Sequence, residues 1–134
     1  MLTVGATVVV MKDNKVLLNL RSDTHSWGIP GGAIELGETI EQTADRELKE
    51  ETNLTAEEYI FLHLFSGIDF YFKYPNGDEL FSVVALYLAK GVGGEMKITD
   101  GESMSLRFFG KEELPPLEKR AEKIIEWLIS ENHF

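Results

Sequence analysis

The stretch Gly32–Leu54, GAIELGETIEQTADRELKEETNL, is the most informative part of the 134-residue chain. If residues 39–52 form a helix, Glu47, Glu50 and Glu51 stand at positions i, i+3 and i+4 and share one face. Like charges at this spacing repel each other, by roughly 0.2–0.5 kcal/mol per pair. A cation among them would remove the repulsion, and carboxylates are the ligands that Mg²⁺ and Mn²⁺ prefer. The spacing therefore predicts a metal site.

The same stretch predicts how the helix packs and begins. Ile40, Ala44 and Leu48 recur at every fourth position, so we expect them to form a buried stripe away from the glutamates. Glu38 precedes the helix, where the helix dipole favours a carboxylate. We expect Glu38 to cap free amides or to support the loop, and direct metal binding is the alternative.

The stretch resembles the signature of the Nudix (MutT-like) hydrolases, which reads Gly, five residues, Glu, seven residues, Arg-Glu-aliphatic-x-Glu-Glu-x-Gly-aliphatic. The residues in register are Gly32, Glu38, Arg46, Glu47, Leu48, Glu50, Glu51 and Leu54. Only the second glycine differs, and the Asn53 in its place is the residue type that best tolerates a left-handed backbone after glycine. The segment Trp27–Gly32 also looks like the family's usual approach to this motif.

The resemblance implies an α/β protein with the Nudix fold, an α/β/α sandwich in which helices flank a mixed β-sheet. It also implies a Mg²⁺-dependent pyrophosphohydrolase, with Mn²⁺ as the alternative ion. Such an enzyme cleaves the diphosphate linkage of a nucleoside diphosphate joined to another group, X. ADP-ribose, nucleotide sugars, dinucleoside polyphosphates and ordinary or oxidised nucleoside triphosphates are all candidate substrates, and the sequence does not choose among them.

The resemblance also implies roles for single residues. The implied metal ligands are Glu47, Glu50, Glu51 and the backbone carbonyl of Gly32. Arg46 stands four residues before Glu50, so it can pair with a carboxylate and hold the cluster in place. The general base stays open between Glu50 and Glu102, because many Nudix enzymes draw a further carboxylate from a loop ahead of the last strand. A solvated loop carboxylate is the other interpretation of Glu102.

Outside the motif, Arg21 is the candidate contact for a substrate phosphate, since it ends a predicted strand and leads into the proline-glycine loop. The aromatic residues of the strand patterns, Phe70, Tyr71, Phe72, Tyr74 and Phe81, could stack on a base. Core packing is the commoner role of such residues. The three histidines, His25, His63 and His133, show no ligand spacing.

Composition limits the partners. A formal charge of −10 repels polyanions, which argues against nucleic acid and anionic membranes as the main partner. The resemblance implies a small nucleoside diphosphate derivative as the partner. The chain has no cysteine, which excludes disulfides and thiolate metal sites. The first apolar run, Val4–Met11, is too short to span a membrane, and a cytoplasmic location is the default expectation. A homodimer remains open.

The patterns along the chain favour one domain over residues 1–134, with the Nudix motif at 32–54 and a mixed sheet. The predicted strands are Thr3–Met11, Lys15–Leu20, Tyr59–Tyr74, Leu80–Ala89 and Leu106–Phe109. Asp13-Asn14 and Asn76-Gly77 predict hairpin turns, and Gly91–Gly101 predicts a loop. A closing amphipathic helix is expected after Pro115-Pro116, with a stripe of Leu117, Ala121, Ile124, Ile125, Leu128 and Ile129.

Two other functions compete with catalysis. A nucleotide-sensing module could keep the fold without turnover, but the carboxylate set of the motif is complete here. An ordinary acidic domain with a solvated helix would bind divalent ions equally well after Glu50→Gln, whereas a metal site would lose affinity.

Overall fold

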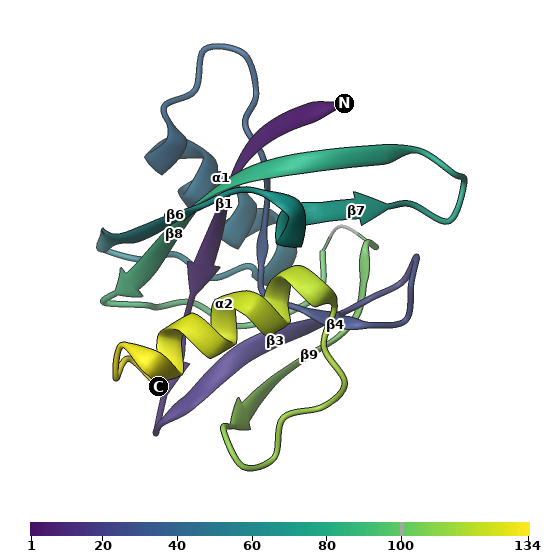
Figure 1. Cartoon of the computed structure of the whole chain (residues 1–134). Helices are drawn as coiled ribbons and strands as arrows, with labels where there is room; N and C mark the ends of the chain where they lie inside the picture. Colours follow the sequence, from purple (N-terminus) through teal and green to yellow (C-terminus); the bar gives the residue numbers. More distant parts are fainter. Residues whose placement is uncertain (100) are drawn as a thin grey trace.

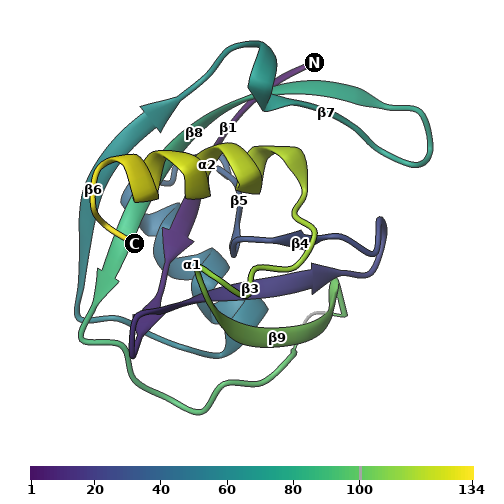
Figure 2. The same cartoon turned by 60° about the horizontal axis from the view of Figure 1, so that its bottom comes forward.

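The computed structural model describes residues 1–99 and 101–134, and it shows two helices on opposite sides of a layer of strands (Figures 1 and 2). The strands form two sheets. The first sheet has the order β5-β1-β8-β6, and β7 also pairs with β8. In the second sheet, β3 pairs with β2, with β4 and with β9. Strands β1 and β8 run parallel and the other pairs are antiparallel, so the first sheet is mixed. The predicted α/β class with helices flanking a mixed sheet is confirmed.

The strands divide between the two sheets as follows. The first sheet contains β1 (Leu2–Val9), β5 (Gly31–Ala33), β6 (Glu58–Phe65), β7 (Tyr71–Lys73) and β8 (Glu79–Lys90). The second contains β2 (Met11–Lys12), β3 (Lys15–Arg21), β4 (Trp27–Gly28) and β9 (Ser103–Gly110). The helices are α1 (Ile40–Thr52) and α2 (Lys119–Ser130), with a short 3₁₀ turn, η1 (Ile68–Phe70), before β7.

Alternation along the strands divides the core between the two helices. In β3, Leu17 packs in the cluster that contains α1 residues, whereas Val16 and Leu18 pack in the cluster that contains α2 residues. In β8, Ala85 and Leu86 divide in the same way. Since successive side chains of a strand point to opposite faces, both faces of the strand layer are buried. Helix α1 thus covers the core on one face of the strand layer, and α2 covers the core on the other face.

Helix α1 begins and ends as its sequence predicts. Thr39 accepts a hydrogen bond from the Gln42 amide, and the Gln42 side chain accepts one from the Thr39 amide, which completes a capping box. Ala44 and Leu48 are fully buried. Asn53 adopts the left-handed conformation at φ 65°, and its amide donates to the Lys49 carbonyl. Asn53 therefore closes the helix as a glycine would.

Three predictions about elements were wrong in part. The continuous strand Tyr59–Tyr74 is interrupted after β6, because Gly67 takes a φ of 99° and turns the chain into η1. The closing helix starts at Lys119, so Leu117 lies ahead of it, where it pairs with Trp27 of β4. Ile129 is 38% exposed and does not belong to the buried stripe.

The turn predictions agree with the backbone. Asp13 and Asn14 both have positive φ, at 51° and 62°, as a two-residue turn between β2 and β3 requires. Gly77 has a φ of 96° in the turn between β7 and β8. The predicted loop Gly91–Gly101 shows no helix or strand over residues 91–99, and Asp100 lies outside the described residues. No helix in the described part of the chain is both long and apolar enough to cross a membrane.

Candidate active site

Arg46 is the centre of the polar cluster on α1. Its Nε and Nη2 donate to the two carboxylate oxygens of Glu38, at 2.7 and 3.0 Å. Its Nη1 donates to Glu47 at 2.7 Å and to Glu50 at 3.2 Å. Its Nη2 also donates to the Ala33 carbonyl of β5, at 3.0 Å. One guanidinium therefore offsets the repulsion among three carboxylates and joins the helix to β5.

Two glycines of β5 allow the carboxylates to approach the backbone. A Cβ on Gly32 would lie 2.5 Å from the Glu47 carboxyl carbon, so any side chain there would displace Glu47. The Gly31 amide donates to Glu51 Oε2 at 2.7 Å, and Glu51 is buried. We call Gly31 and Gly32 the glycine cradle. Both positions need glycine, because backbone atoms of β1 occupy the space of a side chain at Gly31 and the Glu47 side chain of α1 occupies it at Gly32.

Glu38 supports the loop before α1, as the sequence indicated. Its carboxylate accepts from the Glu35 amide and the Thr43 hydroxyl, both at 2.9 Å, besides Arg46. Hydrogen bonds from Arg46, followed by the bond from the Glu35 amide, lower the pKa of Glu38 to about 2.

The lowered pKa of Glu38 predicts a pH dependence of stability. A carboxyl with a depressed pKa in the folded state stabilises above its unfolded value of 4.5, and this stabilisation is lost as the pH falls toward 2. We expect Glu38→Gln to melt below the wild type at pH 7, and the two melting temperatures to converge between pH 4.5 and pH 2. Thermal melts across this range, followed by circular dichroism, measure the difference. A difference that is constant with pH would contradict the prediction.

Glu47 is the most enclosed carboxyl of the group that meets at Arg46, with 13% of its side chain exposed. Burial raises the pKa of Glu47, hydrogen bonding to Arg46 opposes the rise, and the charges of Glu50 and Glu102 add to it. Glu102 directly precedes β9, so it lies ahead of this strand, where the sequence analysis expected it.

The predicted ligands, three carboxylates and the Gly32 carbonyl, offer only oxygen atoms, which suits a hard cation. Among residues 1–99 and 101–134, no three His, Cys, Asp or Glu side chains are arranged so that they could hold a metal ion together. Glu47 and Glu50 instead meet at Nη1 of Arg46. The chemistry of the ligands fits a metal ion, and a bound ion would compete with Arg46 for these two carboxylates.

Arg21 lies in a different environment from the glutamates. Its guanidinium donates to both carboxylate oxygens of Asp23, at 3.0 and 2.8 Å, and lies 4.9 Å from the centre of the Phe72 ring. The guanidinium of Arg120 lies 4.3 Å from the same ring and donates to Ser82. Sequence analysis missed Arg120, since nothing near it in the chain indicates its partners in β7 and β8.

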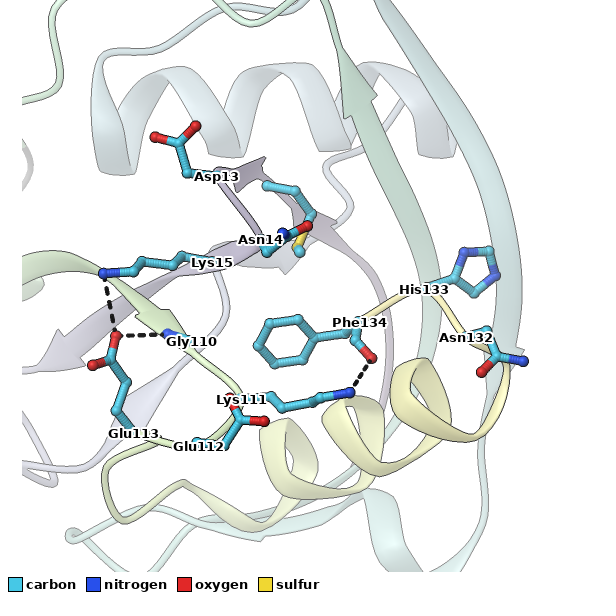
Figure 3. A pocket seen from close by; sticks show the side chains of 11 residues that line it. Asp13, Asn14, Lys15, Gly110, Lys111, Glu112, Glu113, Asn132, His133 and Phe134 are labelled. Carbon is cyan, nitrogen blue, oxygen red and sulfur yellow. Dashed lines mark hydrogen bonds and ion pairs between the residues drawn. The ribbon is translucent and has the colours of Figure 1, made fainter.

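A cavity of about 590 Å³ opens beside the β2–β3 turn, and its described lining contains none of the predicted site residues. Figure 3 shows Lys15 directed at Glu113, 3.4 Å away, and Lys111 directed at the main-chain oxygen of Phe134, 3.5 Å away. Both ammonium groups are therefore already engaged by other atoms of the lining. The carboxylate cluster on α1 is the stronger candidate for catalysis.

Comparisons with known proteins agree with this geometry. A model of the NUDIX domain matches residues 1–128. The ADP-ribose pyrophosphatase of Methanocaldococcus jannaschii is 36% identical over 121 residues, which cover 88% of this chain and 68% of that protein. The 8-oxo-dGTP diphosphatase of Escherichia coli is 29% identical over 119 residues, 86% of this chain and 88% of that protein.

A solved structure supports the same assignment. The MutT NUDIX hydrolase of Burkholderia pseudomallei has a TM-score of 0.79 and 27% identity, with 94% of this chain and 97% of that one covered. Fold, site and relatives together define a hydrolase of phosphoric anhydrides. The chain belongs to the NUDIX family. Members of this family generally use a divalent metal ion, and the prediction of a Nudix hydrolase is confirmed.

Proposed function

We propose that this Nudix hydrolase is a Mg²⁺-dependent pyrophosphohydrolase that cleaves the diphosphate linkage of a nucleoside diphosphate joined to a group X. ADP-ribose is the first candidate substrate and 8-oxo-dGTP the second, because relatives that align with most of this chain carry these names. The observation that carries the proposal is the convergence of Glu38, Glu47 and Glu50 on Arg46 beside the glycines of β5.

The proposed metal ligands are Glu47, Glu50, Glu51 and the carbonyl of Gly32, with Mn²⁺ as the alternative ion. When bound, the ion would neutralise the phosphoryl oxygens and lower the pKa of a nearby water. Arg46 keeps the carboxylates together in its absence, because its guanidinium bonds both Glu47 and Glu50. Glu51 is oriented by the Gly31 amide.

We assign the general base to Glu50, with Glu102 as the alternative. The Glu50 side chain is 52% exposed, so a substrate or a water can reach it, whereas Glu47 is enclosed. In the reaction, the oxygen of water bonds to one phosphorus and the bond from that phosphorus to the bridging oxygen breaks. The bridging oxygen leaves with the other phosphate, and the proton of water passes to the base.

Arg21 is the proposed contact for the substrate outside the cluster. It is the last residue of β3, and both its guanidinium and that of Arg120 lie against the Phe72 ring. Arginine is suited to phosphate recognition because its planar donors match two oxygens at once. The charge of −10 favours a small substrate over nucleic acid, because the chain repels polyanions. As a separate proposal, we place the enzyme in the cytoplasm.

The test is product release from ADP-ribose, 8-oxo-dGTP, nucleotide sugars and ordinary nucleoside triphosphates, each with Mg²⁺, with Mn²⁺ and with a chelator. We expect turnover of one compound with a metal ion and none with the chelator. Mass spectrometry of the products would identify the bond that breaks. Turnover that is equal with chelator would refute the metal dependence.

A further inference from the structure

Asn19 is a polar residue in a strand that otherwise contributes to the core. It lies in β3 after Val16, Leu17 and Leu18, which are fully buried, and only 6% of Asn19 is exposed. Its Nδ2 donates to the hydroxyl of Ser103, 3.0 Å away, and Ser103 is only 5% exposed. This bond joins residues 84 positions apart in the chain.

The other polar atom of Asn19 is unsatisfied. Among residues 1–99 and 101–134, Oδ1 is buried and has no hydrogen-bond partner. A buried acceptor without a donor is destabilising, and a leucine or valine at this position would avoid the penalty. Local violations of this kind are expected where a residue serves function. Stability alone therefore does not explain an asparagine here.

The bond of Asn19 reaches the segment that carries Glu102. Ser103 is the first residue of β9 and directly follows Glu102. On the other side, Ser22 donates to the Glu102 carbonyl through both its amide, at 2.9 Å, and its hydroxyl, at 2.8 Å. The ladder between β3 and β9 shifts register between Leu20 and Arg21, so backbone pairing is irregular at this end. The Asn19–Ser103 bond and the two bonds from Ser22 thus hold the main chain around Glu102 beside the register shift.

We propose that Asn19 is a positioning residue, which holds the main chain of Glu102 through Ser103 and so fixes the point from which this carboxylate projects. The inference rests on the alternative within the proposed function, in which Glu102 and not Glu50 is the general base. It adds two buried residues to the site that the Nudix motif does not include.

The decisive variant is the pair Asn19→Leu with Ser103→Ala, which removes the unsatisfied oxygen and both members of the buried bond. We expect its melting temperature to equal or exceed that of the wild type, because no buried polar side-chain atom of the pair is left. We expect kcat to fall about tenfold or more, since small displacements of a reacting group are costly, with KM within about twofold. A residue with a purely structural role would instead lose stability and keep kcat.

A second readout does not need catalysis. The Ser22 amide donates to the Glu102 carbonyl, so its hydrogen exchange by NMR reports whether this main chain is held. We expect faster exchange at Ser22 in the double variant and no change at the Leu17 amide, which donates to Val10. Ser103→Thr keeps a hydroxyl and should retain kcat and protection. Ser130→Ala removes an exposed serine hydroxyl at the end of α2, away from β3 and β9, and is the control for loss of a hydroxyl as such.

The outcomes separate the two claims. A wild type that turns over substrate, beside a double variant with unchanged kcat and unchanged Ser22 exchange, would overturn the role of Asn19 and leave the proposed function intact. Glu102→Gln at the wild-type rate would overturn it as well, because there would be no reacting group to position. If the wild type turns over nothing, the proposed function fails, and the Ser22 exchange alone decides whether Asn19 holds this segment.

Discussion

Glu50→Gln is expected to lower kcat about a thousandfold while the protein stays folded. The substitution removes the charge of a proposed ligand and base, and loss of either role typically costs on the order of 10²–10⁴ in rate. Glu50 is half exposed and makes only a 3.2 Å contact to Arg46, so the fold loses little. Steady-state kinetics and a calorimetric titration with Mg²⁺ measure the two effects, and both turnover and ion affinity should fall.

The matched control for this variant is Glu126→Gln on α2. Glu126 is 59% exposed and pairs with Lys123 at 3.6 Å, which resembles the exposure and pairing of Glu50 away from the cluster. It should retain full turnover and ion affinity. Native rates for both Glu50→Gln and Glu51→Gln would show that the assignment of the motif residues is wrong. Lost turnover with a collapsed melting temperature would mean that folding, not chemistry, was affected.

Gly31→Ala is expected to destabilise the protein by about 3 kcal/mol, the upper range for overpacking. A Cβ at Gly31 would lie 2.2 Å from the Ala6 carbonyl oxygen and 2.9 Å from the Thr7 Cα, which are backbone atoms of β1. They cannot move away without breaking the pairing of β1 with β5. The melting temperature should fall by roughly 10 °C.

Gly28→Ala, in the neighbouring strand β4, provides the comparison. Its Cβ would lie 3.6 Å from Asn19 Oδ1 and 4.0 Å from the Arg21 Cδ, both ordinary contact distances. We expect its stability to stay within about 1 kcal/mol of the wild type, since alanine also restricts the unfolded chain. Denaturant unfolding of the two variants tests the difference. Equal stabilities would show that β5 can shift away from β1.

Sequence alone predicted the parts of the site that depend on neighbouring residues. The fourfold stripe of Ala44 and Leu48 and the left-handed Asn53 predicted α1, and the spacing of Glu47 and Glu50 predicted their shared face. These features depend on the geometry of one helix, which a local pattern determines.

Contacts between segments far apart in the chain could not be predicted from the spacing of residues in the sequence. The closeness of Arg21 and Arg120 across Phe72 follows from how β3, β7 and α2 pack, and no spacing in the chain indicates it. The break at Gly67 and the exposure of Ile129 were missed for the same reason, because both depend on tertiary packing and not on the local sequence.

The parallel pairing of β1 with β8 also sets the order in which the site can form. Leu2 lies opposite Phe81 and Val9 opposite Leu88, so the first strand must wait for a segment made much later during synthesis. Strand β5, with its two glycines, pairs with β1 alone in its sheet. Contacts of such long sequence separation form slowly. A nascent chain would therefore carry a complete Nudix motif well before it has the cradle that makes the motif useful.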